Sequence, residues 1–419
     1  MKLSRLITVL MGRGGIPYAD KLLTIQPTYL VGGWPLNDAS GLRAACSVAQ
    51  TYTGNIAYNG DMELAGHGGA VAAAGWYARA GGGTIAAETT DIHGGARAVK
   101  LTEGASTWIY QTIVVKPGQT YAYSFFTHGD GTHPGKYGIK NVSDNLWFVT
   151  LNTTTGVAGT EYTEVTGNII VPATCSEVTV YLQAGTGAGS IAYYDDFTLT
   201  GTVDFGAAYV ASGATLGVTG IGDGQTAVSM TGTYTYLAVQ GALFNSLFDP
   251  DLGSAIAWGK MSAAEWGDAT ELRYLFHAKS TTDANCYIVF GKHTDAKTLF
   301  WRRKTGLGTN ENQKTYVFAG DPPDGGWFCM GYSWDTSTPR LKGYLYVPGV
   351  LAWTKVFDVA GAQVASLAAH DFADLNTCLL AGSSVPGANA QEWMGDGAYI
   401  YLWAGLTLSD AEMQAVMTA

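Results

Sequence analysis

Apolar and polar residues alternate with period two along most of the chain, which is the pattern of strands with one buried face. The run 108–115 predicts a strand, the Pro-Gly pair within 116–119 predicts a turn, and 121–126 predicts the next strand. Turn signals recur every ~8–12 residues, a spacing typical of sandwiches and barrels. Further strands are expected at 169–171, 178–183, 192–199, 271–277, 287–291, 315–318, 327–334, 341–347 and 398–402.

Helical periodicity is confined to two short stretches near the ends of the chain. One covers 18–25 and stops before Pro27, and the other covers 409–417. The second opens with Ser409 and carries Glu412 three residues later, so we expect a capping box at its start. No run approaches the ~20 apolar residues of a membrane-spanning helix. The pattern therefore predicts an all-β protein without a membrane span.

Residues 1–17 differ from the rest of the chain. Lys2 and Arg5 lie among apolar residues, and Arg5 interrupts the apolar core that a secretion signal needs. Glycines at 12, 14 and 15 favour a flexible segment. We therefore expect a short helix or a docking arm, and synthesis in a cytoplasm.

The composition supports a sheet-rich protein and excludes one class of partner. Only 14% of residues are charged, 47% are hydrophobic, and there are 56 glycines. The formal charge of -11 argues against nucleic-acid binding, which needs a basic surface to displace counterions from phosphates. The cysteines are odd in number, widely spaced and without a CxxC pair, so we expect free thiols at Cys46, Cys175, Cys286, Cys329 and Cys378.

The middle of the chain carries a series of motifs in a fixed order. They are NGDME at 59–63, Trp76, GARAVKL at 95–101, WIYQ at 108–111, KPGQTY at 116–121 and YYDDFTL at 193–199. With these motifs, residues 58–200 resemble the carbohydrate-binding modules of families four, nine and twenty-two. The resemblance implies a jelly-roll β-sandwich that binds glycans.

The same resemblance implies a structural calcium ion between the opening and closing motifs. The matching positions are Glu63 and Asp196, with Asp61 and Asp195 beside them. Carboxylates are suitable oxygen ligands for calcium. The alternative is that these acids cap strand ends in solvent.

Aromatic residues are the candidate sugar contacts, because the C–H faces of sugar rings stack on aromatic rings. Alternation places Trp108 and Tyr110 on one face of their strand. One face of each sheet has to be core, so some rings of this segment are structural. The candidates are Trp76, Trp108, Tyr110, Tyr137 and Trp147.

The last part of the chain resembles a second family. The motifs FCMGYSWD at 328–335, LKGYL at 341–345 and GDGAYIYLW at 395–403, followed by LTLSDAE at 406–412, are similar to those of laminin-G-like, concanavalin A-like lectin sandwiches. The opening pieces of that family stand early, as YADKLL at 18–23 and GWPLNDASG at 33–41, whereas the next piece is GIGDGQTAVSM at 220–230.

This separation predicts that one sandwich is inserted into a loop of the other. We expect a docking arm at 1–17, a split concanavalin A/laminin-G-like sandwich at 18–57 and 202–419, and the inserted jelly roll at 58–201. Insertion is tolerated where the termini of the guest lie close together and the host loop is exposed. The alternative is a linear arrangement of an arm and two whole domains.

Catalytic signatures are weak. The acids of the run 265–271, Glu265, Asp268 and Glu271, are three apart, so a strand would point neighbouring ones to opposite faces. No GxSxG, HExxH or P-loop motif is present. We therefore expect a non-enzymatic protein with no cofactor besides calcium.

These features favour a structural and adhesive virion protein, because phage virion proteins resemble this combination of domains. It would be a head decoration, fibre or tail component, made in the host cytoplasm and displayed on the virion surface. We expect repeated copies, docking to capsid or tail proteins through the arm, and binding to cell-surface or environmental glycans. The alternatives are a secreted bacterial carbohydrate-binding or glycoside hydrolase accessory protein and a polysaccharide-degrading enzyme.

Overall fold

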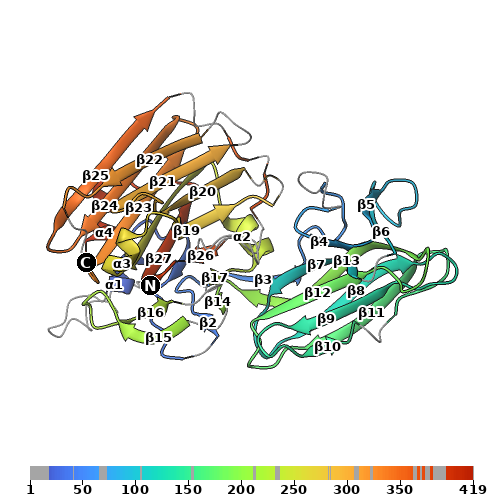
Figure 1. The fold of residues 1–419 in the computed structure, drawn as a ribbon. Coiled ribbons are helices and arrows are strands. Elements are labelled where there is room, and N and C mark those ends of the chain that lie inside the picture. The colour runs from blue at the N-terminus through green and yellow to red at the C-terminus, as the bar shows by residue number, and fades with distance from the viewer. Residues whose placement is uncertain are drawn as a thin grey trace, which may run out of the picture.

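The computed structural model describes residues 18–418, except for 41, 66–72, 104–105, 152–154, 211–213, 232–235, 282, 284, 306–310, 321–323, 362–365, 369, 373–377 and 381–392. The predicted docking arm at 1–17 therefore lies outside the described residues. Strands dominate the described chain, which confirms the all-β class, and they form two sandwiches that lie side by side (Figure 1).

The smaller sandwich consists of two antiparallel sheets around one core. The five-stranded sheet has the order β10 (Trp147–Val149), β9 (Lys136–Asn141), β12 (Glu177–Gln183), β7 (Ser106–Val114) and β4 (Tyr77–Gly81). The six-stranded sheet has the order β11 (Thr163–Ile170), β8 (Thr120–His128), β13 (Ile191–Asp204), β6 (Ala98–Thr102) and β5 (Ile85–Glu88), with β3 (Thr51–Asn55) paired to β13.

The larger sandwich is built on an eight-stranded sheet. Its order is β15 (Ala214–Thr219), β16 (Thr226–Met230), β27 (Gly395–Ala404), β18 (Leu252–Lys260), β23 (Trp327–Asp335), β24 (Arg340–Val347) and β25 (Leu351–Ala360), with β1 (Leu30–Trp34) paired to β27. Two four-stranded sheets complete it: β19 (Arg273–Lys279), β20 (Cys286–Lys292), β21 (Thr298–Thr305) and β22 (Glu311–Val317), and β2 (Arg43–Ala44), β14 (Ala207–Val210), β17 (Tyr236–Ala238) and β26 (Cys378–Leu380).

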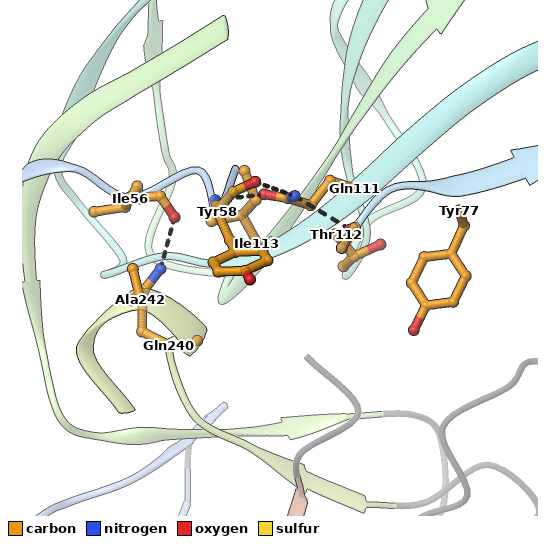
Figure 2. A pocket seen from close by; sticks show the side chains of 10 residues that line it. Ile56, Tyr58, Tyr77, Gln111, Thr112, Ile113, Gln240 and Ala242 are labelled. Carbon is orange, nitrogen blue, oxygen red and sulfur yellow. Dashed lines mark hydrogen bonds between the residues drawn. The ribbon is translucent and has the colours of Figure 1, made fainter. Parts of the chain in front are cut away.

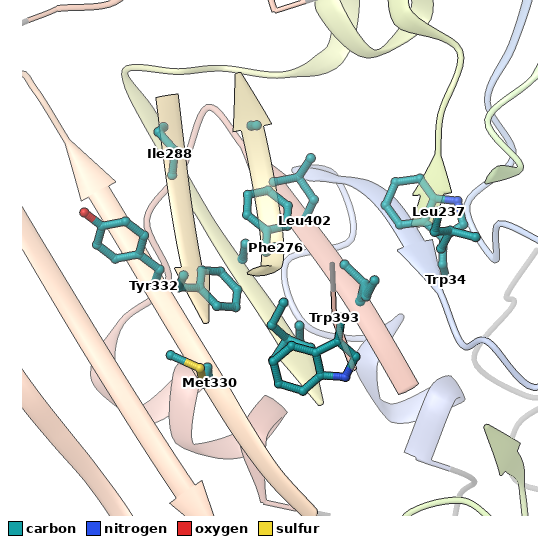
Figure 3. Packing of buried hydrophobic residues seen from close by; sticks show 14 of the residues in the cluster. Trp34, Leu237, Phe276, Ile288, Met330, Tyr332, Trp393 and Leu402 are labelled. Carbon is teal, nitrogen blue, oxygen red and sulfur yellow. The ribbon is translucent and has the colours of Figure 1, made fainter. Parts of the chain in front are cut away.

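Both faces of the eight-stranded sheet are covered. One face packs on a large aromatic core that includes Trp34, Phe276 and Trp393 (Figure 3). The other face carries a second cluster with side chains of α1 (Tyr18–Leu22) and α4 (Asp410–Met417). Burial on both faces explains why the central strands read as almost continuous apolar runs.

The terminal helices form as the pattern predicts. The Ser409 side chain accepts from the backbone of Glu412, whose carboxylate accepts from the backbone N–H of Ser409, which confirms the capping box. The Tyr18 hydroxyl donates to the Val416 carbonyl, and Trp258 Nε1 donates to that hydroxyl at 2.9 Å. Two further short helices, α2 (Gly241–Leu247) and α3 (Ala263–Gly267), lie between strands. In the part of the chain that is described, no helix combines the length and apolar character needed to span a bilayer.

Segments from both ends of the chain share the larger sandwich. The first strand, β1, is hydrogen-bonded to β27, and Trp34 lies in the same core as residues from 205 to 402. Trp34 is 0% exposed, its ring meets Phe205 edge-on at 4.9 Å, and its Nε1 donates to the Phe205 carbonyl at 2.8 Å. The early strand is therefore a core element of this sandwich.

The two crossings between the sandwiches form one ribbon. Strand β3, which we expected in the split sandwich, pairs with the last five residues of β13, from Thr51↔Asp204 to Asn55↔Thr200. The chain thus leaves and re-enters the larger sandwich through adjacent antiparallel strands. A hydrogen-bonded pair of strands is stiffer than two single linkers.

Side-chain contacts also join the sandwiches beside this ribbon. The Tyr58 hydroxyl donates to Asp371 at 2.8 Å, and Gln240 Nε2 donates to the Ile56 carbonyl at 2.8 Å. Val114, on the outer face of the five-stranded sheet, packs on Ala208 and Ala238 of the larger sandwich. One edge of that outer face is thereby covered.

Replacing Trp34 with Ala should destabilise the larger sandwich by about 3–5 kcal/mol, the usual cost of removing a large buried aromatic ring. Denaturant unfolding followed by tryptophan fluorescence measures the change. Tyr29→Ala, at a ring that is 40% exposed, is the control and should stay within about 0.5 kcal/mol. A loss confined to the unfolding of the smaller sandwich would contradict the placement of β1.

Candidate functional site

The outer face of the five-stranded sheet gathers aromatic side chains from four strands. Alternate residues of β7 and β12, such as Ile109 and Val180, point into the core. The residues between them point outward, because neighbouring side chains of a strand face opposite sides. We call this outward surface the aromatic face and define it by the rings of Tyr77, Trp108, Tyr110, Trp147 and Tyr181.

The strand register places these rings in a row across the sheet. Tyr77 is opposite Tyr110, Tyr110 is opposite Tyr181, and Tyr181 is opposite Gly138. The ring centroids of Tyr77 and Tyr110 are 5.4 Å apart, and those of Tyr110 and Tyr181 are 5.7 Å apart. The rings of each pair are nearly parallel, with interplanar angles of 28° and 26°. Tyr110 therefore stacks on the ring of Tyr77 on one side and on the ring of Tyr181 on the other.

Trp147 is the last ring of the row and lies beside Gly138, the residue opposite Tyr181. Its ring lies 5.5 Å from that of Tyr181 and is 37% exposed. A Cβ atom at Gly138 would lie 2.8 Å from the Trp147 ring and 2.9 Å from the Leu151 backbone. A side chain at position 138 would therefore collide with the indole of Trp147.

A second row runs beside the first and is more polar. It consists of Arg79, Trp108, Gln183 and Lys136, which are opposite one another in register. The Arg79 guanidinium lies 4.9 Å from the Trp108 ring, and Lys140 Nζ lies 5.5 Å from the Trp147 ring. Cations at these distances interact favourably with the ring faces. Both indoles thus carry a cation beside them.

Several groups on this face can bind a polyhydroxylated ligand. Gln183 is 6% exposed, and its Oε1 has no hydrogen-bond partner among the described residues. Burial raises the pKa of both Tyr110 and Tyr181, so their phenols are protonated and can donate at neutral pH. A surface that combines ring edges, phenols and an unpaired amide matches the mixed apolar and hydroxyl chemistry of sugars.

The larger sandwich borders one end of the aromatic face. Tyr77 and Thr112 line a small pocket together with Tyr58, Gln240 and Gly241, the last two at the start of α2 (Figure 2). Gln111 inside the smaller sandwich donates to the Tyr58 carbonyl at 2.9 Å and accepts from its N–H at 3.0 Å. Tyr58 at this border is thus bonded to Gln111 of the smaller sandwich and, through its hydroxyl, to Asp371 of the larger one.

One acid lies at this border. Glu177 is opposite Val114 in register, is 3% exposed, and its Oε1 has no hydrogen-bond partner among the described residues. Burial raises the pKa of Glu177 to about 8. The side chain is therefore largely protonated at neutral pH.

The sequence identified some of these residues and missed others. Trp108, Tyr110 and Trp147 lie on the aromatic face as candidates. Trp76 and Tyr137 do not: they are 1% and 9% exposed in the core, so neither ring is available to a glycan. Trp76 Nε1 instead donates to the Asn59 carbonyl at 3.1 Å.

The missed residues are Tyr77, Arg79, Tyr181 and Gln183. Tyr181 and Gln183 alternate with the apolar residues of β12, a signal that was available from the strand pattern. Tyr77 follows Trp76 directly, so period two assigns the two rings to opposite faces. Which of them faces outward depends on the register of β4 against β7.

The four acids expected to hold calcium do not form one ligand set in this arrangement. Asp61 is exposed, whereas Asp195 is 0% exposed. Among the described residues, no three of the acids Asp61, Glu63, Asp195 and Asp196 bring ligand atoms within 4.8 Å of one another. A calcium ion at Glu63 and Asp196 stays a prediction, since calcium is also bound by backbone carbonyl oxygens.

These acids have another structural use. Asp195 accepts from the N–H of His93 at 3.0 Å and of Gly94 at 3.2 Å, and Glu63 accepts from the N–H of Ala96 at 2.8 Å. Asp196 lies 2.7 Å from Nδ1 of His93. Burial raises the pKa of Asp195 to about 6. Asp195 and Asp196 thus hold His93 and Gly94 against β13, and Glu63 holds Ala96 to the opening motif.

Two other polar clusters lie in the larger sandwich. Asp283, Cys286 and His370 bring potential ligand atoms within 4.8 Å of one another. Burial, with Asp283 beside it, raises the pKa of the Cys286 thiol to about 12, so a metal ion would have to displace a firmly held proton. Glu265 and Asp268, considered above as catalytic acids, each pair with Arg273 at 3.2 Å.

Comparison with known proteins supports the fold of the smaller sandwich. Residues 54–189 match the family described as "Carbohydrate binding domain". The segment therefore forms a carbohydrate-binding-module-like jelly roll. The match covers less than half of the chain, and no curated protein matches it.

Solved structures with similarity to the chain include several carbohydrate-binding modules. The CBM22-1 xylan-binding domain of Paenibacillus barcinonensis Xyn10C is 13% identical and covers 37% of this chain and 97% of its own, with a TM-score of 0.27. The CBM40 of Ruminococcus gnavus IT-sialidase bound to α2,3 sialyllactose is 12% identical and covers 46% and 96%, with a TM-score of 0.35.

A phage protein is also among them. Tailspike protein 4 of bacteriophage CBA120 is 16% identical and covers 36% of this chain and 21% of its own, with a TM-score of 0.29.

Glu177 should make stability fall as the pH rises. Its folded-state pKa of about 8 lies above the ordinary value of ~4.3, so the unfolded state loses the proton first. Between pH 6 and pH 9, the wild type should lose about 2–3 kcal/mol more unfolding free energy than Glu177→Gln. Denaturant titrations at both pH values measure this difference.

The control for that measurement is Glu164→Gln on β11, at an exposed acid. It should keep the pH dependence of the wild type. Equal pH slopes for wild type and Glu177→Gln would show that this side chain does not hold a proton in the folded state.

Proposed function

We propose that the protein is a non-catalytic glycan-binding protein and that the aromatic face is its binding surface. The observation that carries the proposal is the row of Tyr77, Tyr110, Tyr181 and Trp147 across four strands. Half-exposed rings in such a row are unusual on a soluble sheet unless a partner covers them. The family match of residues 54–189 supports the same conclusion.

The row also suggests how a glycan lies on the sheet. Adjacent centroids are separated by 5.4, 5.7 and 5.5 Å from Tyr77 to Trp147. A chain laid along this row crosses the strands and meets ring edges and phenols, with the face of Trp147 at the far end. The second row, with Gln183, offers hydrogen bonds along one side.

We further propose that this binding attaches a virion to host or environmental polysaccharide. The support is the resemblance of the whole domain combination to phage virion proteins. Capsid or tail proteins would be the docking partners, and repeated copies would raise avidity. A secreted bacterial carbohydrate-binding protein is the alternative, and mass spectrometry of purified phage particles from the source culture separates the two.

The absence of catalysis is part of the proposal. The Glu265 and Asp268 carboxylates are engaged by Arg273, which favours a structural role for both. Incubation with each bound polysaccharide should release no reducing sugar above a buffer control. Release that is lost in Glu265→Gln would contradict the proposal.

Trp108→Ala and Tyr181→Ala should each lower the affinity for a bound polysaccharide roughly tenfold, corresponding to ~1.4 kcal/mol of lost ring contact. Affinity electrophoresis against a polysaccharide panel identifies the ligand, and calorimetry measures the affinity. Tyr193→Ala is the matched control, since Tyr193 is a half-buried tyrosine on the outer face of the opposite sheet. Binding that depends on Tyr193 and not on Tyr181 would place the site on the other sheet.

A further inference from the structure

The aromatic face carries three cations. Arg79 is on β4, and Lys136 and Lys140 are on β9, all three at outward positions of the five-stranded sheet. Arg79 is exposed, and the two lysines are half-buried. This local excess of positive charge contrasts with the formal charge of -11 for the whole chain.

These cations lack acidic partners in the described structure, in which many other basic side chains are paired. Arg43 and Lys116 pair with Asp204, and Arg340 pairs with Asp358. No ion pair of Arg79, Lys136 or Lys140 with a described acid is present. Among the outward residues of the five strands, the acid is Glu177, and burial raises the pKa of Glu177 to about 8, so it supplies little negative charge.

Two of the cations are held beside the indoles. Arg79 lies against Trp108 at 4.9 Å and Lys140 against Trp147 at 5.5 Å. Contact with the rings restricts both side chains before a ligand binds, which lowers the entropy cost of using them. The hydroxyls of a neutral sugar can accept hydrogen bonds from these cations, but an anionic sugar would gain stronger hydrogen bonds in which both partners are charged.

The combination of an indole ring with a cation over that ring fits one class of sugar. A uronate residue presents an apolar C–H face and, at its edge, a carboxylate. The C–H face can stack on an indole while the carboxylate meets the adjacent guanidinium or ammonium group. Trp108 with Arg79 and Trp147 with Lys140 supply this combination twice, on opposite sides of Tyr181.

We propose that the aromatic face selects acidic polysaccharides whose sugars carry carboxylates, with Arg79, Lys136 and Lys140 as the residues that determine this specificity. The inference rests on the proposed glycan-binding function and names its ligand class. Sulfated chains share the negative charge but lack the planar carboxylate that a guanidinium binds in a bidentate manner.

The test compares acidic chains with neutral forms of the same backbone. Polygalacturonate, alginate and hyaluronate are each measured against their methyl-esterified derivatives by affinity electrophoresis and calorimetry. We expect at least one acidic form to bind ten times more tightly than its ester or better, with an affinity that falls as NaCl rises from 50 to 500 mM. Dextran sulfate should bind more weakly than that acidic form.

Charge variants then locate the effect. Arg79→Gln and Lys140→Gln should each reduce the ratio of acid to ester affinity at least threefold, and the double variant should reduce it further. Lys314→Gln removes the same charge from an exposed position on β22 of the larger sandwich and should leave the ratio unchanged. Thermal melting of each variant verifies that it is folded.

The outcomes separate this inference from the function on which it rests. Equal affinity for acid and ester, lost in Trp108→Ala and Tyr181→Ala, would overturn the acidic specificity and leave glycan binding on this face intact. Acid binding that survives both ring variants, or that depends on Lys314, would overturn both. Stronger binding of dextran sulfate than of every uronate chain would overturn the carboxylate preference.

Discussion

The hydrogen-bonded register of the five-stranded sheet is the constraint on which the aromatic face depends. Antiparallel pairing of β4, β7, β12 and β9 brings Tyr77, Tyr110, Tyr181 and Gly138 into one line. A shift of one residue in any strand would turn its rings into the core and its core residues outward. The apolar inner face, which includes Ile109, Val180 and Ile139, makes such a shift costly. Burial of the inward side chains thus fixes the strand register, and the register fixes where the outward rings lie.

The larger sandwich supplies none of the rings of the aromatic face, but its contacts with the smaller sandwich hold that face in a defined orientation. The ribbon of β3 and the end of β13 carries both crossings, and Val114 packs on Ala208 and Ala238. Tyr58 extends from the smaller sandwich to Asp371 of the larger one. A glycan on the aromatic face would therefore approach a surface whose orientation relative to the larger sandwich is defined.

Acidic side chains show how burial and pairing decide what a motif does. Glu63 and Asp195 stand where the family motifs place them, but their oxygens accept backbone N–H groups of the segment 93–97. Glu265 and Asp268 neutralise Arg273. In each case the residue types are compatible with a site, and the structure shows which hydrogen-bond or ion-pair partners these acids have within the chain.

The sequence alone determined the all-β class, the strands β7 and β8 and the capping box at Ser409, because period two, turn residues and caps act over short distances. It also placed Trp108 and Tyr110 together on one face of their strand. Only the tertiary structure decided that Trp76 and Tyr137 belong to the core and Tyr77 and Tyr181 to the surface. The reason is that alternation separates the two faces of a strand, whereas pairing and packing between distant strands decide which face is covered.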